Sequence, residues 1–328
     1  MNLQADKNYR TIIPPLLTDS ERPLWSVMIP TYNCADYLRE TLQAVLSQDP
    51  GPHKMQIEVV DDCSTKDDPE KVVNELGKGR VSFFRQPQNV GHTKNFDTCL
   101  SRSRGQLVHL LHGDDRVRNG FYEKIGKLFL DYEEIGAAFC RHIFMDENSH
   151  WQLLSPLESP KPGILDGWFE KIAIKQRILT PSIVVKREVY EQLGSFDHRL
   201  SWAEDWEMWA RIAAYYPIAY EPEPLAEYRS HSTSNTGRYI RTAENLRDLK
   251  RASYIINSYV KDSHKKDLLQ RSFQKHTDYG IQTLKQFYLS GDKEGAMAQW
   301  KEVWQLSKSP YILWLGLIYW LKFLKRGK

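Results

Sequence analysis

The sequence has few cysteines, and they form no recognisable pattern. Four occur in 328 residues, and they lie far apart: Cys34, Cys63, Cys99 and Cys140. No CxxC pair and no Cys/His spacing indicates a zinc site, so a metal centre of that kind is not predicted. A reducing cytosol is the simplest setting for such a chain.

Long apolar runs and a strong net charge are also missing. No stretch reaches the roughly 20 apolar residues of a membrane span, and the N-terminus has no apolar core of the signal-peptide kind. The formal net charge of +3 is too small to argue for a nucleic-acid partner. Hydrophobic residues make up 41% and charged residues 27% of the chain, which predicts a soluble, cytoplasmic, globular protein of one large or two ordinary domains.

Three signature loops are absent. There is no GxGxxG after the first predicted strand, no GxxxxGK[ST] and no GxSxG. These absences argue against dinucleotide cofactors, P-loop chemistry and a serine hydrolase.

Apolar strands alternate with amphipathic helices after a polar, proline-containing lead-in at residues 1–23. The pattern predicts strands at 25–30, 56–60, 81–86 and 107–111. It predicts helices at 35–48 and 69–77, and a glycine-containing turn followed by a helix that ends at Gly105 over 88–105, with Asn33 as the N-cap of the first helix. Such alternation predicts an α/β fold with a largely parallel sheet and helices on both faces.

Two of these strands end in adjacent acids, Asp61-Asp62 and Asp114-Asp115. Parallel strands end on the same edge of a sheet, where ligands of open α/β sheets bind, so both pairs are expected there. Adjacent carboxylates repel each other unless a cation or strong donors lie beside them. Mg²⁺ or Mn²⁺ with a substrate phosphate would satisfy them. A solvated turn that caps the next helix remains an alternative.

A third acidic pair, Glu204-Asp205, lies at the start of a helix whose apolar stripe includes Trp206 and Trp209. The helix dipole favours acids in a first turn, so this pair has a purely structural explanation too. An extended stretch and a polar loop with Arg229 and His231 follow at 218–236.

The chain is predicted to be helical from residue 238, with two antiparallel helices over 265–307 and a turn at 290–292. Residues 311–321 are almost all apolar, include Trp314, Tyr319 and Trp320, which are aromatics of the membrane-interface type, and precede a basic end. This helix is too short to span, so we expect either peripheral membrane contact through 310–328 or packing on its own domain or a second subunit, as a homo-oligomer. The predicted domains are 1–23, 24–237 and 238–328.

Six motifs occur in a fixed order: SVMIPTYN (26–33), VVDDCSTKD (59–67), GHTKN (91–95), LLHGDD (110–115), AEDWEMWAR (203–211) and YRSHSTS (228–234). Together they resemble the family 2 glycosyltransferases, which have the GT-A fold, over about residues 24–235. The resemblance implies inverting transfer of a sugar from a nucleotide diphosphate sugar, a UDP-sugar by preference, to a glycan or lipid-linked acceptor. Together with this class, the soluble composition and the basic tail favour a cytosolic enzyme at the inner face of the membrane that takes part in cell-surface polysaccharide biosynthesis.

The resemblance assigns roles to matching positions. It implies that Asp205 is the catalytic base and that Asp114 and Asp115 hold Mn²⁺ or Mg²⁺. The implied nucleotide-binding residues are Pro30, Thr31, Tyr32, Asp61, Asp62 (near the ribose), Lys94, Asn95 and Asp114. The residues implied to surround the diphosphate and acceptor are Glu204, Arg229 and His231.

One position departs from the family pattern. Many members carry a further aspartate where this chain has His112, which predicts a changed metal preference, because imidazole suits Mn²⁺ better than Mg²⁺. No QxxRW-type motif of the processive synthases is present, so transfer of one or a few sugars is expected. A catalytically silent, nucleotide-binding or scaffolding module of the same fold remains the alternative.

Overall fold

The computed structural model describes residues 7–16, 22–230, 235–261 and 263–326 and divides the chain into two compact units. The first unit comprises Met1–Trp168, Arg177–His198 and Tyr215–His231. The second comprises Phe169–Gln176, Arg199–Ala214 and Ser232–Lys328, so the helix that begins at Glu204 groups with the C-terminal helices.

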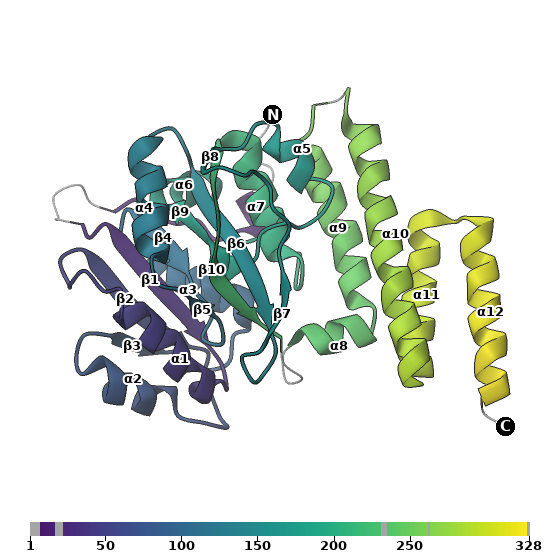
Figure 1. The fold of residues 1–328 in the computed structure, drawn as a ribbon, viewed down its shortest axis with the longest axis horizontal. Helices are drawn as coiled ribbons and strands as arrows, with labels where there is room; N and C mark the ends of the chain where they lie inside the picture. The colour runs from purple at the N-terminus through teal and green to yellow at the C-terminus, as the bar shows by residue number, and fades with distance from the viewer. Residues whose placement is uncertain (1–6, 17–21, 231–234, 262, 327–328) are drawn as a thin grey trace. The chain divides into compact units, whose positions relative to one another are not determined.

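One mostly parallel sheet organises the first unit (Figure 1). Its strand order in the described chain is β3-β2-β1-β4-β9-β6-β10-β5, with β7 beside β6 and β8 beside β10. Neighbours β1, β2, β3 and β4 run parallel, as do β6 and β10, whereas β9 is antiparallel to both β4 and β6. The strands are β1 Trp25–Thr31, β2 Met55–Asp61, β3 Ser82–Arg85, β4 Leu107–Leu110, β5 Arg116–Val117, β6 Ala137–Met145, β7 Trp151–Leu154, β8 Gly163–Ile164, β9 Ile183–Lys186 and β10 Ile218–Arg229.

Helices cover both faces of this sheet, as the alternation of apolar segments predicts. On one face, Val27 and Ile29 of β1 pack in a cluster with Leu38 and Leu42 of α1. Met28, which alternates with them, belongs to the other face, where α3 packs. The helices of this unit are α1 Ala35–Leu46, α2 Pro69–Gly77, α3 His92–Arg102, α4 Phe121–Asp131 and α6 Arg187–Leu193, with short 3₁₀ turns at Lys7–Tyr9 and Thr180–Ser182.

The predicted stop of the third helix at Gly105 is wrong by three residues, because α3 ends at Arg102. Gly105 is needed for a different reason. A Cβ atom there would lie 2.4 Å from the carbonyl carbon of Trp25, so only glycine lets this segment approach β1. The Ser26 hydroxyl accepts a hydrogen bond from the Gly105 amide at 2.7 Å and secures the approach.

The predicted N-cap Asn33 is also wrong, because the N-cap position of α1 is Cys34. Asn33 has φ 52°, and its side-chain oxygen accepts hydrogen bonds from the amides of Thr65 and Lys66 at 2.8 and 3.0 Å. In return, the Asp67 carboxylate accepts the amide of Ala35, the first residue of α1, at 2.8 Å. The loops after β1 and β2 therefore hold each other in place, which a local capping rule does not anticipate.

The second unit is built of helices and connecting turns, with no strand among its described residues (Figure 1). The predicted pair of antiparallel helices is confirmed: α10 ends at Ser290, Gly291 takes φ 82°, and Asp292 caps α11 through the Gly295 amide at 3.0 Å. Among the described residues, no helix is both long and apolar enough to cross a membrane. The helices are α5 Trp168–Ile172, α7 Glu204–Tyr215, α8 Asn235–Arg241, α9 Glu244–Ser258, α10 Lys265–Ser290, α11 Lys293–Ser307 and α12 Pro310–Arg326.

Candidate active site

Both acidic pairs of the first unit lie at one edge of its sheet, as the parallel arrangement predicts. Thr31, the last residue of β1, is in register with Asp61, the last residue of β2. The main chain after β4 continues along β1, since the Gly113 amide donates to the Pro30 carbonyl at 3.0 Å. The loop with Asp114 and Asp115 therefore starts at the same edge as Asp61 and Asp62.

His112, Asp114 and Asp115 form a cluster whose candidate ligand atoms lie within 4.8 Å of one another. Asp115 is 1% exposed, and its Oδ1 accepts the backbone amide of Arg229 at 2.8 Å. Its Oδ2 accepts no hydrogen bond from any described residue and lies 3.7 Å from His112 Nδ1. Burial, and secondarily the charge of Asp114, raise the pKa of Asp115 well above the usual range. An enclosed carboxylate with an oxygen that accepts no hydrogen bond, beside a second carboxylate and an imidazole, could hold a divalent cation.

The predicted loop position of Arg229 is wrong, because Arg229 is the last residue of β10. The residue is 2% exposed. Its guanidinium donates to the carbonyl of Asp114 at 2.9 Å and to the side chains of Glu40 and Ser149, each at 2.8 Å. The backbone amide of Arg229 also donates to Asp115. These contacts hold the acidic loop in place, and the guanidinium is not exposed to solvent. His231, predicted beside it, lies outside the described residues.

The carboxylates of Asp61 and Asp62 are buried and bind the chain around them. Asp62 accepts the amides of Val90 and Gly91 at 2.7 and 3.0 Å, just before α3 begins. Asp61 accepts the Nε–H of Arg85 at 2.8 Å. Burial is the main reason that the pKa of Asp62 is raised. Both acids therefore shape the loops that border this edge of the sheet.

The other residues predicted to bind nucleotide fall into two groups. Pro30, Thr31 and Asn95 are buried, and the Asn95 amide is engaged twice: it donates to the Val60 carbonyl at 2.9 Å and accepts from Gln86 at 3.1 Å. Tyr32 is 46% exposed, and Lys94 is exposed on the first turn of α3. Only the side chains of Tyr32 and Lys94, among these five, are well exposed to solvent.

In the second unit, Glu204 and Asp205 form the first turn of α7. Gln176 donates a hydrogen bond to Asp205 Oδ2 at 2.6 Å. Burial, and then the neighbouring charge of Glu204, raise the pKa of Asp205 well above its usual range. A carboxylate with a raised pKa is a stronger base than an ordinary aspartate, so Asp205 is suited to accepting a proton.

Gln176 and Asp248 have no signal in the sequence. Asp248 accepts hydrogen bonds from the backbone just before Glu204. Neither residue belongs to a motif, and neither is adjacent in sequence to the acids that it serves. Residues that are brought to a site only by tertiary structure have no characteristic spacing in the sequence, so no sequence motif reveals them.

A mostly parallel α/β sheet with a cluster of two aspartates and a histidine at its carboxyl edge, followed by a helical region, is the architecture of a GT-A nucleotide-sugar transferase. The model of glycosyl transferase family 2 matches residues 26–194, which is more than half of the chain. The chain belongs to this family, and its activity class is glycosyl transfer from a nucleotide-sugar donor.

Three similar proteins agree with that placement. A glycosyltransferase of Rickettsia prowazekii, described as uncharacterized, is 26% identical over 234 residues that cover 69% of this chain and 70% of the relative. TarS 1–349 of Staphylococcus aureus, in complex with UDP-GlcNAc, superposes with a TM-score of 0.65 at 16% identity, over 86% of this chain and 80% of TarS. The mannosyltransferase PcManGT of Pyrobaculum calidifontis, with GDP-Man and Mn²⁺, gives 0.54 at 16% identity, over 97% and 90%. At these identities the two structures show the shared fold.

Proposed function

We propose that this chain catalyses inverting transfer of a sugar from a UDP-sugar to a hydroxyl of a glycan or lipid-linked acceptor, in the assembly of a cell-surface polysaccharide. One observation carries the proposal: Asp115 is enclosed at the sheet edge beside Asp114 and His112, with an oxygen that no described hydrogen bond satisfies. Family membership supplies the reaction class.

Donor binding is proposed at the edge where β1, β2 and β4 end. Tyr32 and Lys94 contact the nucleotide and its phosphates, while Pro30, Thr31, Asp61 and Asp62 shape the border of the pocket. Asn95 supports α3 through its two buried hydrogen bonds. The UDP-sugar bound by TarS supports this donor class, and PcManGT supports a cation.

His112, Asp114 and Asp115 would hold the divalent cation, Mn²⁺ in preference to Mg²⁺. When bound, the cation would neutralise negative charge on the departing diphosphate. Arg229 keeps the acidic loop in shape through its bonds to the main chain of Asp114 and the side chain of Asp115. Lys94 contributes a further positive charge to the leaving group.

Asp205 acts as the base in this proposal. It takes the proton of the acceptor hydroxyl as the hydroxyl oxygen forms a bond to the anomeric carbon. The bond from that carbon to the phosphate oxygen breaks, and its electron pair leaves with the nucleoside diphosphate. One displacement inverts the anomeric centre, and the leaving group needs no general acid.

The donor class is tested by thermal unfolding with UDP, GDP, dTDP and CMP, each with and without Mn²⁺ or Mg²⁺. A ligand that binds only the folded state at 100 times its Kd stabilises it by about 2.7 kcal/mol. We expect a rise in Tm with UDP that requires the metal. No rise with any nucleotide would contradict the donor assignment and would support a silent scaffolding module that binds no nucleotide.

The last helix, α12, carries the proposed contact with the membrane. Ile312 and Leu315 are buried, and Gly316 lies close against Trp300 of α11. The large side chains left exposed are Tyr311, Leu313, Trp314, Leu317 and Leu321. An apolar, aromatic surface followed by the basic residues of 322–328 is suited to the interface of an anionic bilayer.

Replacing Trp314, which is 58% exposed, by serine is expected to lower co-sedimentation with anionic phosphatidylglycerol vesicles several-fold. The matched control is Leu130→Ser in α4, a leucine that is 78% exposed in the other unit and should leave sedimentation unchanged. Equal sedimentation of all three proteins would contradict membrane contact. A dimer in gel filtration that Trp314→Ser dissociates would assign the surface to a second copy instead.

A further inference from the structure

Asp248, in α9, binds the segment that leads into the acidic pair of α7. Its Oδ2 accepts hydrogen bonds from three consecutive backbone amides, those of Ser201, Trp202 and Ala203, at 3.0, 2.8 and 2.9 Å. The next residue, Glu204, begins α7, and Asp205 follows it. One side-chain oxygen therefore fixes the main chain immediately before the proposed base.

Burial raises the pKa of Asp248, and the hydrogen bonds from three backbone amides oppose that shift. The residue is 2% exposed, and three N–H groups that converge on one oxygen stabilise the anion. Its other oxygen accepts from Arg251 at 3.1 Å, and Arg251 also donates to the Arg199 carbonyl at 2.7 Å. The carboxylate and its arginine therefore hold both ends of the segment 199–203.

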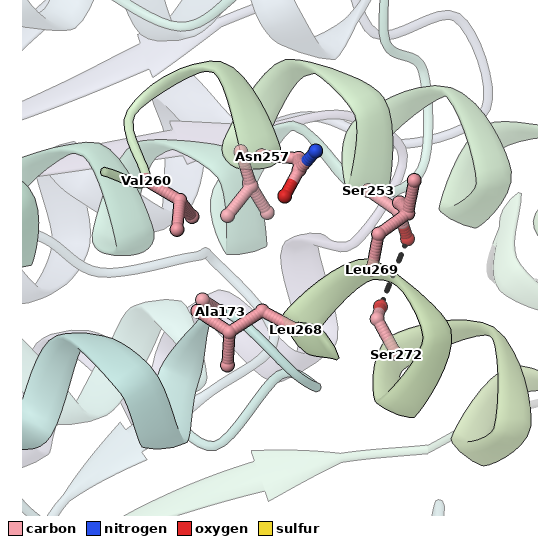
Figure 2. A pocket seen from close by; sticks show the side chains of 8 residues that line it. Ala173, Ser253, Asn257, Val260, Leu268, Leu269 and Ser272 are labelled. Atoms are coloured by element: carbon pink, nitrogen blue, oxygen red, sulfur yellow. Dashed lines mark hydrogen bonds between the residues drawn. The ribbon is translucent and has the colours of Figure 1, made fainter. Parts of the chain in front are cut away.

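Helix α9 is itself anchored to α10. The hydroxyls of Ser253 and Ser272 are hydrogen-bonded at 3.0 Å, as Figure 2 shows, and His276 Nε2 lies 3.2 Å from Ser253 Oγ. The side chains of Val260 and Leu268 join the same contact surface in an apolar cluster. Asp248 is therefore carried by a helix that has little freedom to shift.

The first turns of α7 are held at two further points by these helices. The Tyr259 hydroxyl donates to Glu207 Oε1 at 2.6 Å. The ring of His276 meets Trp206 edge-on, with centroids 5.2 Å apart. Asp205 thus lies between a fixed segment on its N-terminal side and two fixed residues on its C-terminal side.

We propose that Asp248 is a positioning residue of the transfer reaction, which holds the backbone of 201–203 so that the Asp205 carboxyl has one orientation. The proposal rests on the proposed function of Asp205 as the base. A misplacement of about 1 Å in a reacting group costs about 10²-fold in rate, so loss of this hold has a kinetic cost.

The test is Asp248→Asn, which keeps the size of the side chain and removes its charge, so that the remaining neutral oxygen holds the three amides more weakly than a carboxylate does. We expect kcat to fall about 10- to 100-fold, while the KM of the donor sugar and the Kd of UDP stay within about two-fold. The matched control is Asp292→Asn, because Asp292 also accepts a backbone amide in the same unit, at the start of α11. The control should lower Tm and leave kcat unchanged. A kcat of Asp248→Asn equal to that of the control would overturn the proposal.

A double mutant separates positioning from general loss of stability. In an Asp205→Asn background, adding Asp248→Asn should leave the residual rate within about two-fold, because Asp248 acts through Asp205. A further loss as large as in the wild-type background would contradict this. Should Asp248→Asn fail to fold, Arg251→Ala serves instead, with a smaller fall in kcat expected at constant KM and an unchanged kcat contradicting the proposal.

The rates of the two single variants distinguish the base role of Asp205 from the positioning role of Asp248. A near-normal rate of Asp205→Asn would remove the base assignment itself. A large loss for Asp205→Asn together with a normal kcat for Asp248→Asn would remove only the positioning role.

Discussion

Replacing Asp205 by asparagine is expected to lower kcat about 10²- to 10⁴-fold, the range that a general base contributes. Asparagine has the same shape and can still accept the hydrogen bond from Gln176, so the fold around α7 should persist. The affinity for UDP should be unchanged, because Asp205 is proposed to act on the acceptor hydroxyl and not to contact the nucleotide. Initial rates and calorimetric titration with UDP and Mn²⁺ measure the two quantities.

The pH dependence of the wild-type enzyme gives this prediction a second readout. The pKa of Asp205 is raised by burial and by Glu204, and only the deprotonated form can act as a base. The rate should therefore fall as the pH drops through a pKa that is above that of an ordinary aspartate. The residual rate of Asp205→Asn should lack this acidic limb. An exposed acid in α4 supplies the control: Asp131→Asn should keep both the rate and the pH profile. Near-normal turnover of Asp205→Asn would exclude it as the base.

Replacing Asp115 by asparagine is expected to have opposite effects with and without metal. In the presence of Mn²⁺, donor affinity should fall by at least about 100-fold, since even residues that only support metal ligands contribute 10- to 100-fold. The metal-dependent rise in Tm with UDP should disappear. Titrations of UDP with and without Mn²⁺ measure the loss directly.

In metal-free protein the same variant should be more stable than the wild type near neutral pH. The folded state raises the pKa of Asp115 well above its unfolded value, so ionising this buried carboxyl costs stability as the pH rises. Asparagine avoids that cost and can still accept the Arg229 amide. Thermal unfolding in a chelator shows the sign, and Asp131→Asn again serves as the control. A metal-dependent rise in Tm equal to that of the wild type would rule Asp115 out as a ligand.

The elements of the sheet could be predicted because their signals are local. The apolar runs of β1, β2 and β4 and the helical periodicity of α1 and α2 each lie within a dozen residues. Parallel pairing then puts the acids of two strands at one edge without further information. The order of six motifs was specific enough to predict the family, which the match over 26–194 confirms.

What the sequence could not predict are side chains whose partners are distant. Asn33 was expected to cap α1 but binds the loop after β2, because a long-range bond to two amides replaced the local one. Arg229 was placed in a loop by the polar residues that follow it, yet its guanidinium lies among buried acceptors. Asp248 carried no signal, since its three amide partners are 45 to 47 residues earlier in the chain. The roles assigned to the other site residues, His231 included, stay predictions.

The contacts of Arg229 also determine when, during synthesis of the chain, the acidic loop can reach its final structure. This residue ties Glu40, 189 positions earlier, to the loop of Asp114 and Asp115, more than 100 positions earlier. Contacts of such sequence separation form late, and a chain emerging from the ribosome folds from its N-terminus. A nascent chain from which Arg229 has not yet emerged already contains His112, Asp114 and Asp115. It lacks the hydrogen bonds from Arg229 that hold their loop in place. The proposed cation site is therefore complete only after most of the sheet has been synthesised.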